Sequence, residues 1–487
     1  MKHKKLYIKL ISFLLILIYT LPVNAVATSS TISKWPYYDL NIASQSAYVI
    51  DADSSIVLYS YNPTKKLYPA SLAKIMTALV VFDKANGNYD DLVTFSYNAV
   101  TKDIDKNSVT IGASASDQLS VKDCLYCLLL PSANDAANAL AEHYAGSIND
   151  FALLMNEKAE NLGLENTHFV NPSGLHDDNQ YTSAEDMAKI LQCAMTYPIF
   201  MQISSSLSYK HAPIRKYKNP ENSNNVVLNT NSILSSGSKY YYNKAVAGKT
   251  GHTNAAGYNL AVCARNNGMN LVCVTLGAKT EKDRFDDTKK LCEFHFDNYK
   301  SLKIKDIDKR FDDSISSLSI NDVHLIESLN ITCSDSAHIT LPKNIDENSV
   351  KSVLSFQVDD IYNKYAIGSL HYYLDDVLVG KCTLEGRNID NIEEIYTSHL
   401  NLNNPLSSND DDAIKNNDSN STTNNLLISI NDDGELVLSN TLITLIIIII
   451  ILIVAIVFIS FIYINIFNNP NIPFAKFLFR LRRKFRR

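Results

Sequence analysis

Three short groups of residues carry side chains that could act together on a carbonyl group. The first pairs Ser71 with Lys74, within Tyr68-Pro-Ala-Ser-Leu-Ala-Lys74. Burial lowers the pKa of a lysine amine, so Lys74 could take the proton of the Ser71 hydroxyl and turn it into a nucleophile. The alternative is an N-capping serine beside a surface lysine. Ser236-Gly-Ser-Lys239 has the same spacing in a Gly/Ser loop, so spacing alone decides nothing.

The other two groups lie further along the chain. They are Ser132-Ala-Asn134 and Lys249-Thr250-Gly251. Each has an ordinary explanation when taken alone, because Ser and Asn satisfy loop backbone and a strand can end by turning at glycine. Together with Ser71 and Lys74 they form one ordered set of three motifs, in which Ser71 could be a nucleophile and Lys74 its base. That combination of side chains suits acyl transfer.

The surrounding pattern predicts elements that could position these groups. Leu72, Ile75, Met76 and Leu79 follow the spacing of a buried helix face, with Pro69 stiffening its entry. Ser71 and Lys74 would then lie one turn apart on one side of that helix.

The remaining groups fall on a loop and a strand. Ser132 and Asn134 fall in a break after Pro131, between a helix that starts at the cap Ser120-Val-Lys-Asp123 and a second helix over 135–143. Lys249 closes an expected strand over 244–249, which 257–264 and 270–277 should follow, and an amphipathic helix should fill 281–300.

The order of the three motifs and the residues beside them resemble a known family. The segments Tyr68–Thr77, Leu128–Ala137, Tyr181–Ala188 and Gly248–Gly257 are similar to those of low-molecular-mass penicillin-binding proteins, the serine-type D-Ala-D-Ala carboxypeptidases. The resemblance covers about residues 40–300. It implies an α/β (α+β) catalytic domain of the DD-peptidase/β-lactamase type over 44–300, with a mainly antiparallel sheet flanked by helices.

The resemblance also implies a role for each reactive group. Ser71 would attack the carbonyl of the penultimate D-Ala and form an acyl-enzyme, with Lys74 as its base. Ser132, with Lys249 nearby, would pass the proton to the departing D-Ala amine. The backbone N–H groups of Ser71 and His252 would form the oxyanion hole.

Binding of the substrate would fall to the other residues of the motifs. Asn134 would hold the peptide amide, and Lys249 with Thr250 would receive the terminal carboxylate. Gly251 would let substrate lie along the strand edge, where a Cβ would clash. The family implies the peptidoglycan pentapeptide as substrate and β-lactams as covalent inhibitors. We expect no cofactor and no metal.

Three other functions remain open on the sequence. A β-lactamase would need a carboxylate to activate the deacylating water, and Glu165 is a candidate, but the residues after it, Phe169–Leu175, match carboxypeptidases. A muropeptide endopeptidase and a non-enzymatic wall-binding protein are the other two alternatives.

Both ends of the sequence predict export and membrane attachment. Residues 1–25 read as a signal peptide, followed by a lead-in over 26–43. Residues 441–467 are apolar enough for a transmembrane helix, and the basic tail 468–487 should be cytoplasmic and hold to anionic lipid. The catalytic domain would then be extracytoplasmic on a single-pass membrane protein. The net charge is −6, and nothing reads as a basic patch for nucleic acid.

Two further segments differ from the catalytic part in hydrophobic pattern or in composition. Residues 302–397 show short alternating strands without a long helical period, which predicts a small separate β domain. Residues 401–438 are dense in Asn, Asp and Ser and have no aromatic residue, which predicts a disordered stalk.

The chain has eight cysteines, and none is required for stability in a chain of this length. Cys124 and Cys127 have metal-like spacing, but they lie in an apolar helical pattern without partner motifs, so we expect small buried hydrophobic residues. Cys263 and Cys273 flank a turn signal and could face each other across a hairpin.

Overall fold

The structure is a computed structural model. It describes residues 39–101, 104, 108–215, 225–311, 318–320, 323–325, 331–355, 366–386, 428–430 and 436–438. The predicted signal peptide, transmembrane segment and basic tail lie outside these residues, as does most of the lead-in. Among the residues that are described, no helix is long and apolar enough to cross a bilayer.

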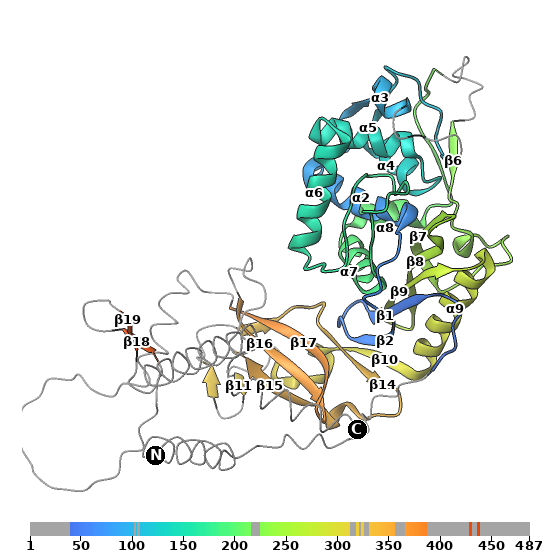
Figure 1. Ribbon diagram of the computed structural model, residues 1–487. Coiled ribbons are helices and arrows are strands. Elements are labelled where there is room, and N and C mark those ends of the chain that lie inside the picture. The colour runs from blue at the N-terminus through green and yellow to red at the C-terminus, as the bar shows by residue number, and fades with distance from the viewer. Residues whose placement is uncertain are drawn as a thin grey trace, which may run out of the picture. The chain divides into compact units, whose positions relative to one another are not determined.

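A five-stranded antiparallel sheet with strand order β2-β1-β9-β8-β7 forms the centre of the first domain (Figure 1). Its strands are β1 (Ser46–Asp51), β2 (Val57–Tyr61), β7 (Ala245–Thr253), β8 (Gly257–Asn266) and β9 (Met269–Ala278). The last strand, β9, pairs with the first, β1, so β2 and β7 lie at the two edges of the sheet. Lys249 is thus carried by an edge strand, β7.

Helices between β2 and β7 cover one face of the sheet and extend away from it (Figure 1). They are α2 (Ala73–Ala85), α3 (Tyr97–Thr101), α4 (Val121–Leu129), α5 (Asn134–Ala145), α6 (Ile148–Asn161), α7 (Ala184–Met195) and α8 (Pro198–Ser205). As predicted, the Ser120 side chain caps α4, accepting from the Asp123 N–H at 3.0 Å. Leu79, at the centre of α2, is fully buried among these helices.

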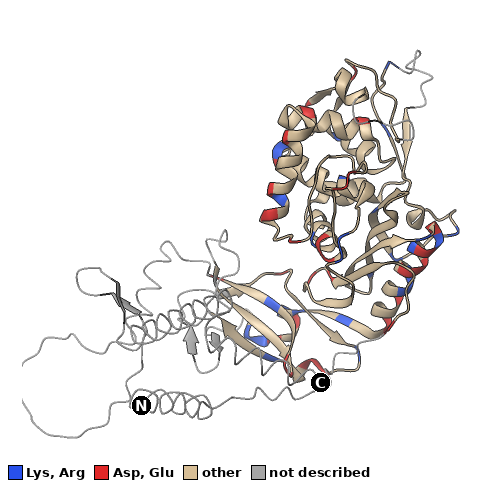
Figure 2. Cartoon of the chain, in the orientation of Figure 1, with Lys and Arg blue, Asp and Glu red and all other residues tan. Residues whose placement is uncertain are grey.

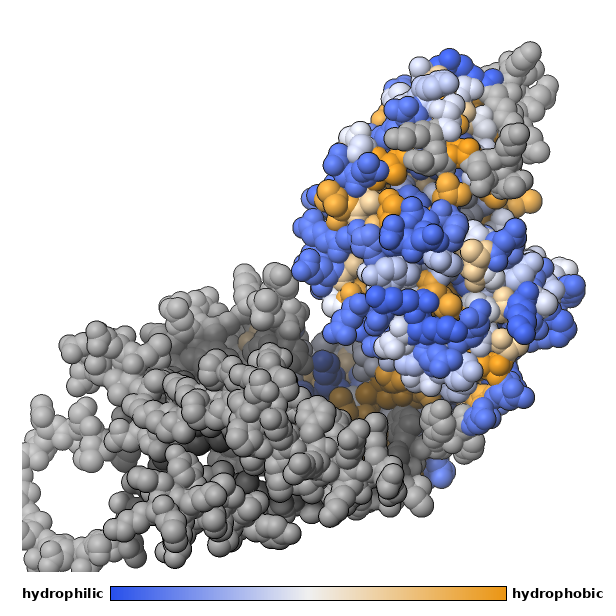
Figure 3. Space-filling model, viewed as in Figure 1, coloured by the Kyte–Doolittle hydropathy of each residue, from blue (hydrophilic) through white to orange (hydrophobic). Residues whose placement is uncertain are grey.

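The opposite face of the sheet is covered by α9 (Glu281–Asn298), which starts with a capping box of Thr280 and Asp283. The sheet thus has helices on both faces, and the expected mainly antiparallel fold is confirmed. Figure 2 shows charged residues along the outer side of α9, although Arg284 and Asp287 of the same helix are buried. In the view of Figure 3, hydrophilic residues cover most of this domain and apolar residues are scattered between them.

Cys263 and Cys273, which the sequence left as a possible pair, do not face each other across the hairpin. In the β8–β9 register Cys263 is opposite Val272, and Cys273 is opposite Val262. Adjacent residues of a strand point to opposite faces, so the two thiols lie on opposite sides of the sheet. Cys263 packs under the helices of one face, whereas Cys273 packs toward α9. All eight cysteines are free, and Cys124 and Cys127 are fully buried, as expected for small apolar residues.

A second sheet follows α9 without an intervening linker. Its path is β10-β14-β17-β16-β15, with β13 also paired to β17. The strands are β10 (Tyr299–Lys303), β13 (Ile331–Cys333), β14 (His338–Pro342), β15 (Lys351–Ser355), β16 (Ala366–Leu374) and β17 (Val377–Gly386). The sheet has its own core, which includes Ile339, Leu370 and Val379. It starts slightly earlier than the expected boundary at 302, because α9 leads straight into β10.

Short strand pairs complete the described chain. They are β3 (Leu92–Thr94) with β4 (Gln118–Ser120), β5 (Ser208–Lys210) with β6 (Val226–Leu228), and β11 (Leu318–Ile320) with β12 (Val323–Leu325). Within the predicted stalk, β18 (Ile428–Ile430) pairs with β19 (Leu436–Leu438), and the rest of the predicted stalk lies outside the described residues.

Candidate active site

Ser71 lies in a tight turn at the start of a buried helix. The turn is the 3-10 segment η1 (Ala70–Leu72), which leads directly into α2. Ala70 has a φ of 49°, a left-handed conformation that a residue with a side chain adopts only under constraint. The Ser71 hydroxyl and the Lys74 amine are 3.3 Å apart, one turn along the chain. This is the relation that the sequence predicted.

Lys74 is fully buried beneath the helices. Its Nζ donates to Asn134 Oδ1 at 2.7 Å and also to the backbone carbonyl of Ser173. Burial, and after it the positive charge of Lys249, lower the pKa of Lys74 well below its usual value, while Asp135 opposes the shift. A lysine in this setting can be neutral near neutral pH, as a base for Ser71 requires. The competing surface-lysine interpretation of Lys74 is therefore wrong.

Ser132 occupies the break between α4 and α5. Its backbone is left-handed, with a φ of 73°, and its buried Oγ has no hydrogen-bond partner among the described residues. A buried hydroxyl without a partner is unfavourable unless a ligand supplies one. Asn134 starts α5 and links two groups, since its Oδ1 accepts from Lys74 and its Nδ2 donates to Ser108 Oγ at 3.1 Å. The structure thus brings two of the three motifs into contact.

Asp135 is a buried carboxylate beside this loop that the sequence motif did not single out. It accepts backbone N–H groups of Ile111, Gly112 and Ala113 at 3.1–3.3 Å. Burial raises its pKa although these N–H groups oppose the rise. Asp135 therefore fixes the segment before α4 against the start of α5, and so holds Asn134 in place.

The third motif lies on the edge strand β7. Lys249 is 2% exposed, and its Nζ donates to the Thr250 carbonyl at 3.0 Å. Burial, and then the charge of Arg284, lower the pKa of Lys249 to about 7. A Cβ on Gly251 would lie 2.8 Å from the Pro69 carbonyl oxygen, so glycine is needed for β7 to approach the Ser71 turn. His252 follows on the same strand and is exposed.

Arg284 is a site residue that the sequence did not predict. It lies in the first turn of α9 and is 5% exposed, with its guanidinium 5.3 Å from the Tyr258 ring centre. It reaches the Gly251 carbonyl at 3.5 Å and pairs with Glu281 at 3.1 Å, and its Nε has no partner among the described residues. In the sequence it is one of many charges at the start of an amphipathic helix, and no spacing marks it.

Other candidate features fall outside this site. The decoy pair Ser236 and Lys239 is exposed, and the Lys239 amine lies 4.8 Å from the Tyr240 ring centre. Glu165 is exposed after α6. No group of three His, Cys, Asp or Glu side chains in the described part of the chain could hold a metal ion.

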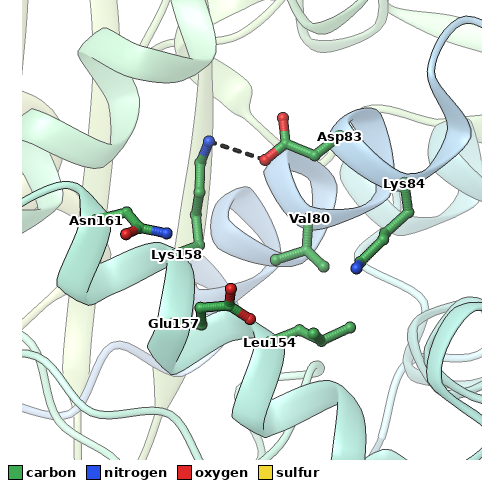
Figure 4. A pocket seen from close by; sticks show the side chains of 7 residues that line it. All are labelled: Val80, Asp83, Lys84, Leu154, Glu157, Lys158 and Asn161. Carbon is green, nitrogen blue, oxygen red and sulfur yellow. Dashed lines mark ion pairs between the residues drawn. The ribbon is translucent and has the colours of Figure 1, made fainter. Parts of the chain in front are cut away.

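A separate pocket of about 190 Å³ lies between α2 and α6 (Figure 4). Lys158 and Asp83 form an ion pair there at 2.8 Å. The pocket contains none of the motif residues, so we assign it no part in the chemistry.

Comparison with known proteins agrees with this geometry. The family model described as D-alanyl-D-alanine carboxypeptidase matches residues 30–280, more than half of the chain. D-alanyl-D-alanine carboxypeptidase DacA of Haemophilus influenzae is 33% identical over 270 residues, covering 54% of this chain and 64% of the relative. The chain thus spans slightly less than two thirds of that relative's length.

Two further proteins extend the comparison. D-alanyl-D-alanine endopeptidase of Escherichia coli (strain K12) is 31% identical over 285 residues, covering 57% of this chain and 86% of the relative. The crystal structure of penicillin binding protein 5 from Haemophilus influenzae superposes with a TM-score of 0.57 at 29% identity, covering 72% of this chain and 99% of that one. The sequence match, the fold and the three assembled motifs lead to one conclusion: the chain belongs to the D-alanyl-D-alanine carboxypeptidase family.

Proposed function

We propose that the protein is a serine-type D-Ala-D-Ala carboxypeptidase that removes the terminal D-Ala from peptidoglycan pentapeptide stems. The observation that carries this proposal is the buried amine of Lys74, 3.3 Å from the Ser71 hydroxyl and with a lowered pKa. A neutral amine in that position can accept the Ser71 proton as Oγ attacks the carbonyl of the penultimate D-Ala.

The remaining steps use the other motifs. The oxygen of the tetrahedral intermediate would accept from the backbone N–H groups of Ser71 and His252. Ser132 would deliver a proton to the leaving D-Ala amine as the C–N bond breaks, and Lys74 would replace it with the proton taken from Ser71. Water would then hydrolyse the ester on Ser71 and release the shortened stem.

Substrate recognition would depend on charge and on the strand edge. Lys249 and Thr250 would bind the free carboxylate of the terminal D-Ala, and Asn134 the peptide amide. The buried partnerless hydroxyl of Ser132 supports a site that is completed by substrate. A β-lactam presents the same carbonyl and carboxylate, and would acylate Ser71 and remain attached.

The test uses the purified chain with a fluorescent penicillin and with a peptide ending in D-Ala-D-Ala. We expect long-lived labelling that Ser71→Ala abolishes, together with release of free D-Ala. Rapid turnover of the label would instead indicate a β-lactamase, and absence of labelling would indicate a non-enzymatic wall-binding protein. The exposed position of Glu165 gives no support to the β-lactamase alternative.

Endopeptidase activity is the second candidate, because a relative of comparable identity carries the name D-alanyl-D-alanine endopeptidase. Cross-linked muropeptide dimers separate the two activities. Cleavage of dimers without release of D-Ala from pentapeptides would favour the endopeptidase.

We further propose that the enzyme acts outside the cytoplasm from a single membrane anchor. The support is the sequence alone: a signal peptide over 1–25, an uncharged apolar segment over 441–467 and the basic tail 468–487. Protease treatment of intact spheroplasts should degrade the catalytic domain and leave the tail protected. Degradation of the tail with protection of the catalytic domain would refute this orientation.

A further inference from the structure

The side-chain amide of Asn259 lies directly beneath the turn that carries Ser71. Asn259 is on β8, is fully buried, and is paired with Gly251 of β7. Its Nδ2 donates to two consecutive carbonyls, those of Tyr68 at 2.9 Å and Pro69 at 3.1 Å. Its Oδ1 accepts from the Gly277 N–H of β9 at 2.8 Å. Both donor hydrogens and the carbonyl of one amide are therefore in use.

These contacts join three parts of the chain that are far apart in the sequence. The two carbonyls belong to the last residues before η1, so they set where the Ser71 backbone N–H lies and where it points. Gly277 is in β9, which anchors the amide to the middle of the sheet. The Ser71 turn is thus tied to the sheet by a short planar group with little freedom of its own.

The contact of Asn259 with the Ser71 turn matters because Asn259 is paired with a residue of β7, the strand that carries the third motif. Gly251 is paired with Asn259, and the next residue of β7 is His252, which is paired with Tyr258. β7 is an edge strand, so its other side has no neighbouring strand in this sheet. Because Gly251 has no side chain, the Ser71 turn can approach β7 closely. The hydrogen bond from Asn259 to the Pro69 carbonyl then holds the turn at that distance.

We propose that Asn259 is a positioning residue that sets the distance and direction of the Ser71 and His252 N–H groups relative to each other. This inference rests on the proposed acyl-transfer function, in which those two groups stabilise the oxyanion. Asn259 itself does not touch the reacting atoms. Its contribution should appear in the rate of acylation, because misplacement of an oxyanion donor by a fraction of an ångström weakens transition-state stabilisation much more than substrate binding.

The strained conformation of Ala70 fits this role. Its φ of 49° lies between Pro69, held by Asn259, and Ser71. A left-handed residue with a side chain persists only when its surroundings hold it there. If the Pro69 carbonyl lost its hydrogen bond from Asn259, Ala70 could leave its left-handed conformation. The Ser71 N–H would then no longer point to the same place as the His252 N–H.

The test compares Asn259→Ala, Asn259→Asp and Asn259→Ser in the full chain. Asp can still accept from the Gly277 N–H but cannot donate to the two carbonyls when ionised, whereas Ser can donate once. We expect the acylation rate constant with a fluorescent penicillin to fall about 10- to 100-fold for Ala and Asp, and less for Ser. The fraction of molecules finally labelled should stay near that of the wild type.

A second measurement separates positioning from general damage. A boronic acid that forms a tetrahedral adduct with Ser71 should lose affinity by about the same factor as the acylation rate, while KM for the peptide changes little. The matched control is Asn270→Ala, which removes an amide bonded to Asp53 and Arg265 at the opposite end of β9. It should leave the acylation rate within about twofold of the wild type.

The inference is overturned if the Asn259 variants acylate at the wild-type rate. It is equally overturned if only the labelled fraction falls while the labelled molecules react at the normal rate, since that is the behaviour of a purely structural residue. Failure of the proposed function would look different, because the wild type itself would then neither be labelled nor release D-Ala.

Discussion

At the scale of single residues, the proposed reaction depends on an amine that must be free of its proton. Lys74 is buried, and both burial and Lys249 lower its pKa. We expect Lys74→Arg to lower the acylation rate constant by about 10²- to 10⁴-fold, because arginine stays protonated and cannot act as the base. Stopped-flow labelling with a fluorescent penicillin measures this. Lys239→Arg, in the exposed decoy motif, is the control and should leave the rate unchanged.

Lys249, the second lysine of the site, should give a pH dependence opposite in sign to that of Lys74. In the proposed reaction Lys249 must be protonated to bind the substrate carboxylate, and its pKa is lowered to about 7. In the free enzyme this interaction is present below pH 7 and is lost as the pH rises through that value. The profile of kcat/KM for D-Ala release should therefore fall on its alkaline side with a midpoint near 7.

Arg284→Gln tests the cause of that midpoint. The positive charge of Arg284 is the second contribution to the lowered pKa of Lys249, after burial. Its removal should shift the alkaline limb of the kcat/KM profile to higher pH. A limb that stays in place, or moves to lower pH, would show that Lys249 does not govern it.

The residues that sequence could identify are those whose spacing is local or whose motif is shared. Ser71 and Lys74 are three positions apart in a helical pattern, so their proximity follows from helix geometry. Arg284 and Asn259 reach the site only through sheet pairing and the docking of α9. No local pattern distinguishes them from other helix charges and strand amides, so only the folded structure could reveal them.

At the scale of elements, the site depends on how closely the Ser71 turn can approach β7. A Cβ on Gly251 would meet the Pro69 carbonyl oxygen at 2.8 Å and Leu72 at 3.3 Å. We expect Gly251→Ala to push the turn from the strand and to lower the acylation rate at least tenfold. Gly237→Ala, where a Cβ would meet nothing within 4 Å, is the control and should react normally.

The order of the elements was easier to predict than their register. The hydrophobic period located β7, β8, β9 and α9, and the capping residue Ser120 located the start of α4. Which side chains face each other across a hairpin depends on the pairing register of its strands. A shift of one residue moves each side chain to the other face of the sheet. The turn between Cys263 and Cys273 does not specify that register, so the sequence could not decide whether the two cysteines face each other.

At the scale of the whole molecule, the two sheets meet through buried polar contacts. Thr340 of β14 donates to Asp51 Oδ2 at 2.7 Å, and its hydroxyl also lies 2.5 Å from Ser54 Oγ. Thr340 and Asp51 are both fully buried. Burial raises the pKa of Asp51, and the hydrogen bonds from its hydroxyl partners oppose that rise.

Thr340→Val should therefore destabilise the protein without changing its chemistry. Loss of a buried donor to Asp51 should lower the free energy of unfolding by about 1–3 kcal/mol. Denaturant unfolding of the full chain measures this, and Thr332→Val, at a half-buried hydroxyl bonded to the Cys333 carbonyl, should cost less. A change in the penicillin acylation rate larger than about twofold would contradict the assignment of Thr340 to stability alone.

The contact of Asp51 with Thr340 also limits how such proteins can exchange parts during evolution. A β domain transplanted from another protein would have to bring a hydroxyl to the place of Thr340, or the buried carboxylate of Asp51 would lose a hydrogen-bond donor. The two domains must therefore have matching residues where they meet. Chimaeras that respect it should be recoverable as folded protein, whereas those that place valine or leucine there should need a compensating change at Asp51.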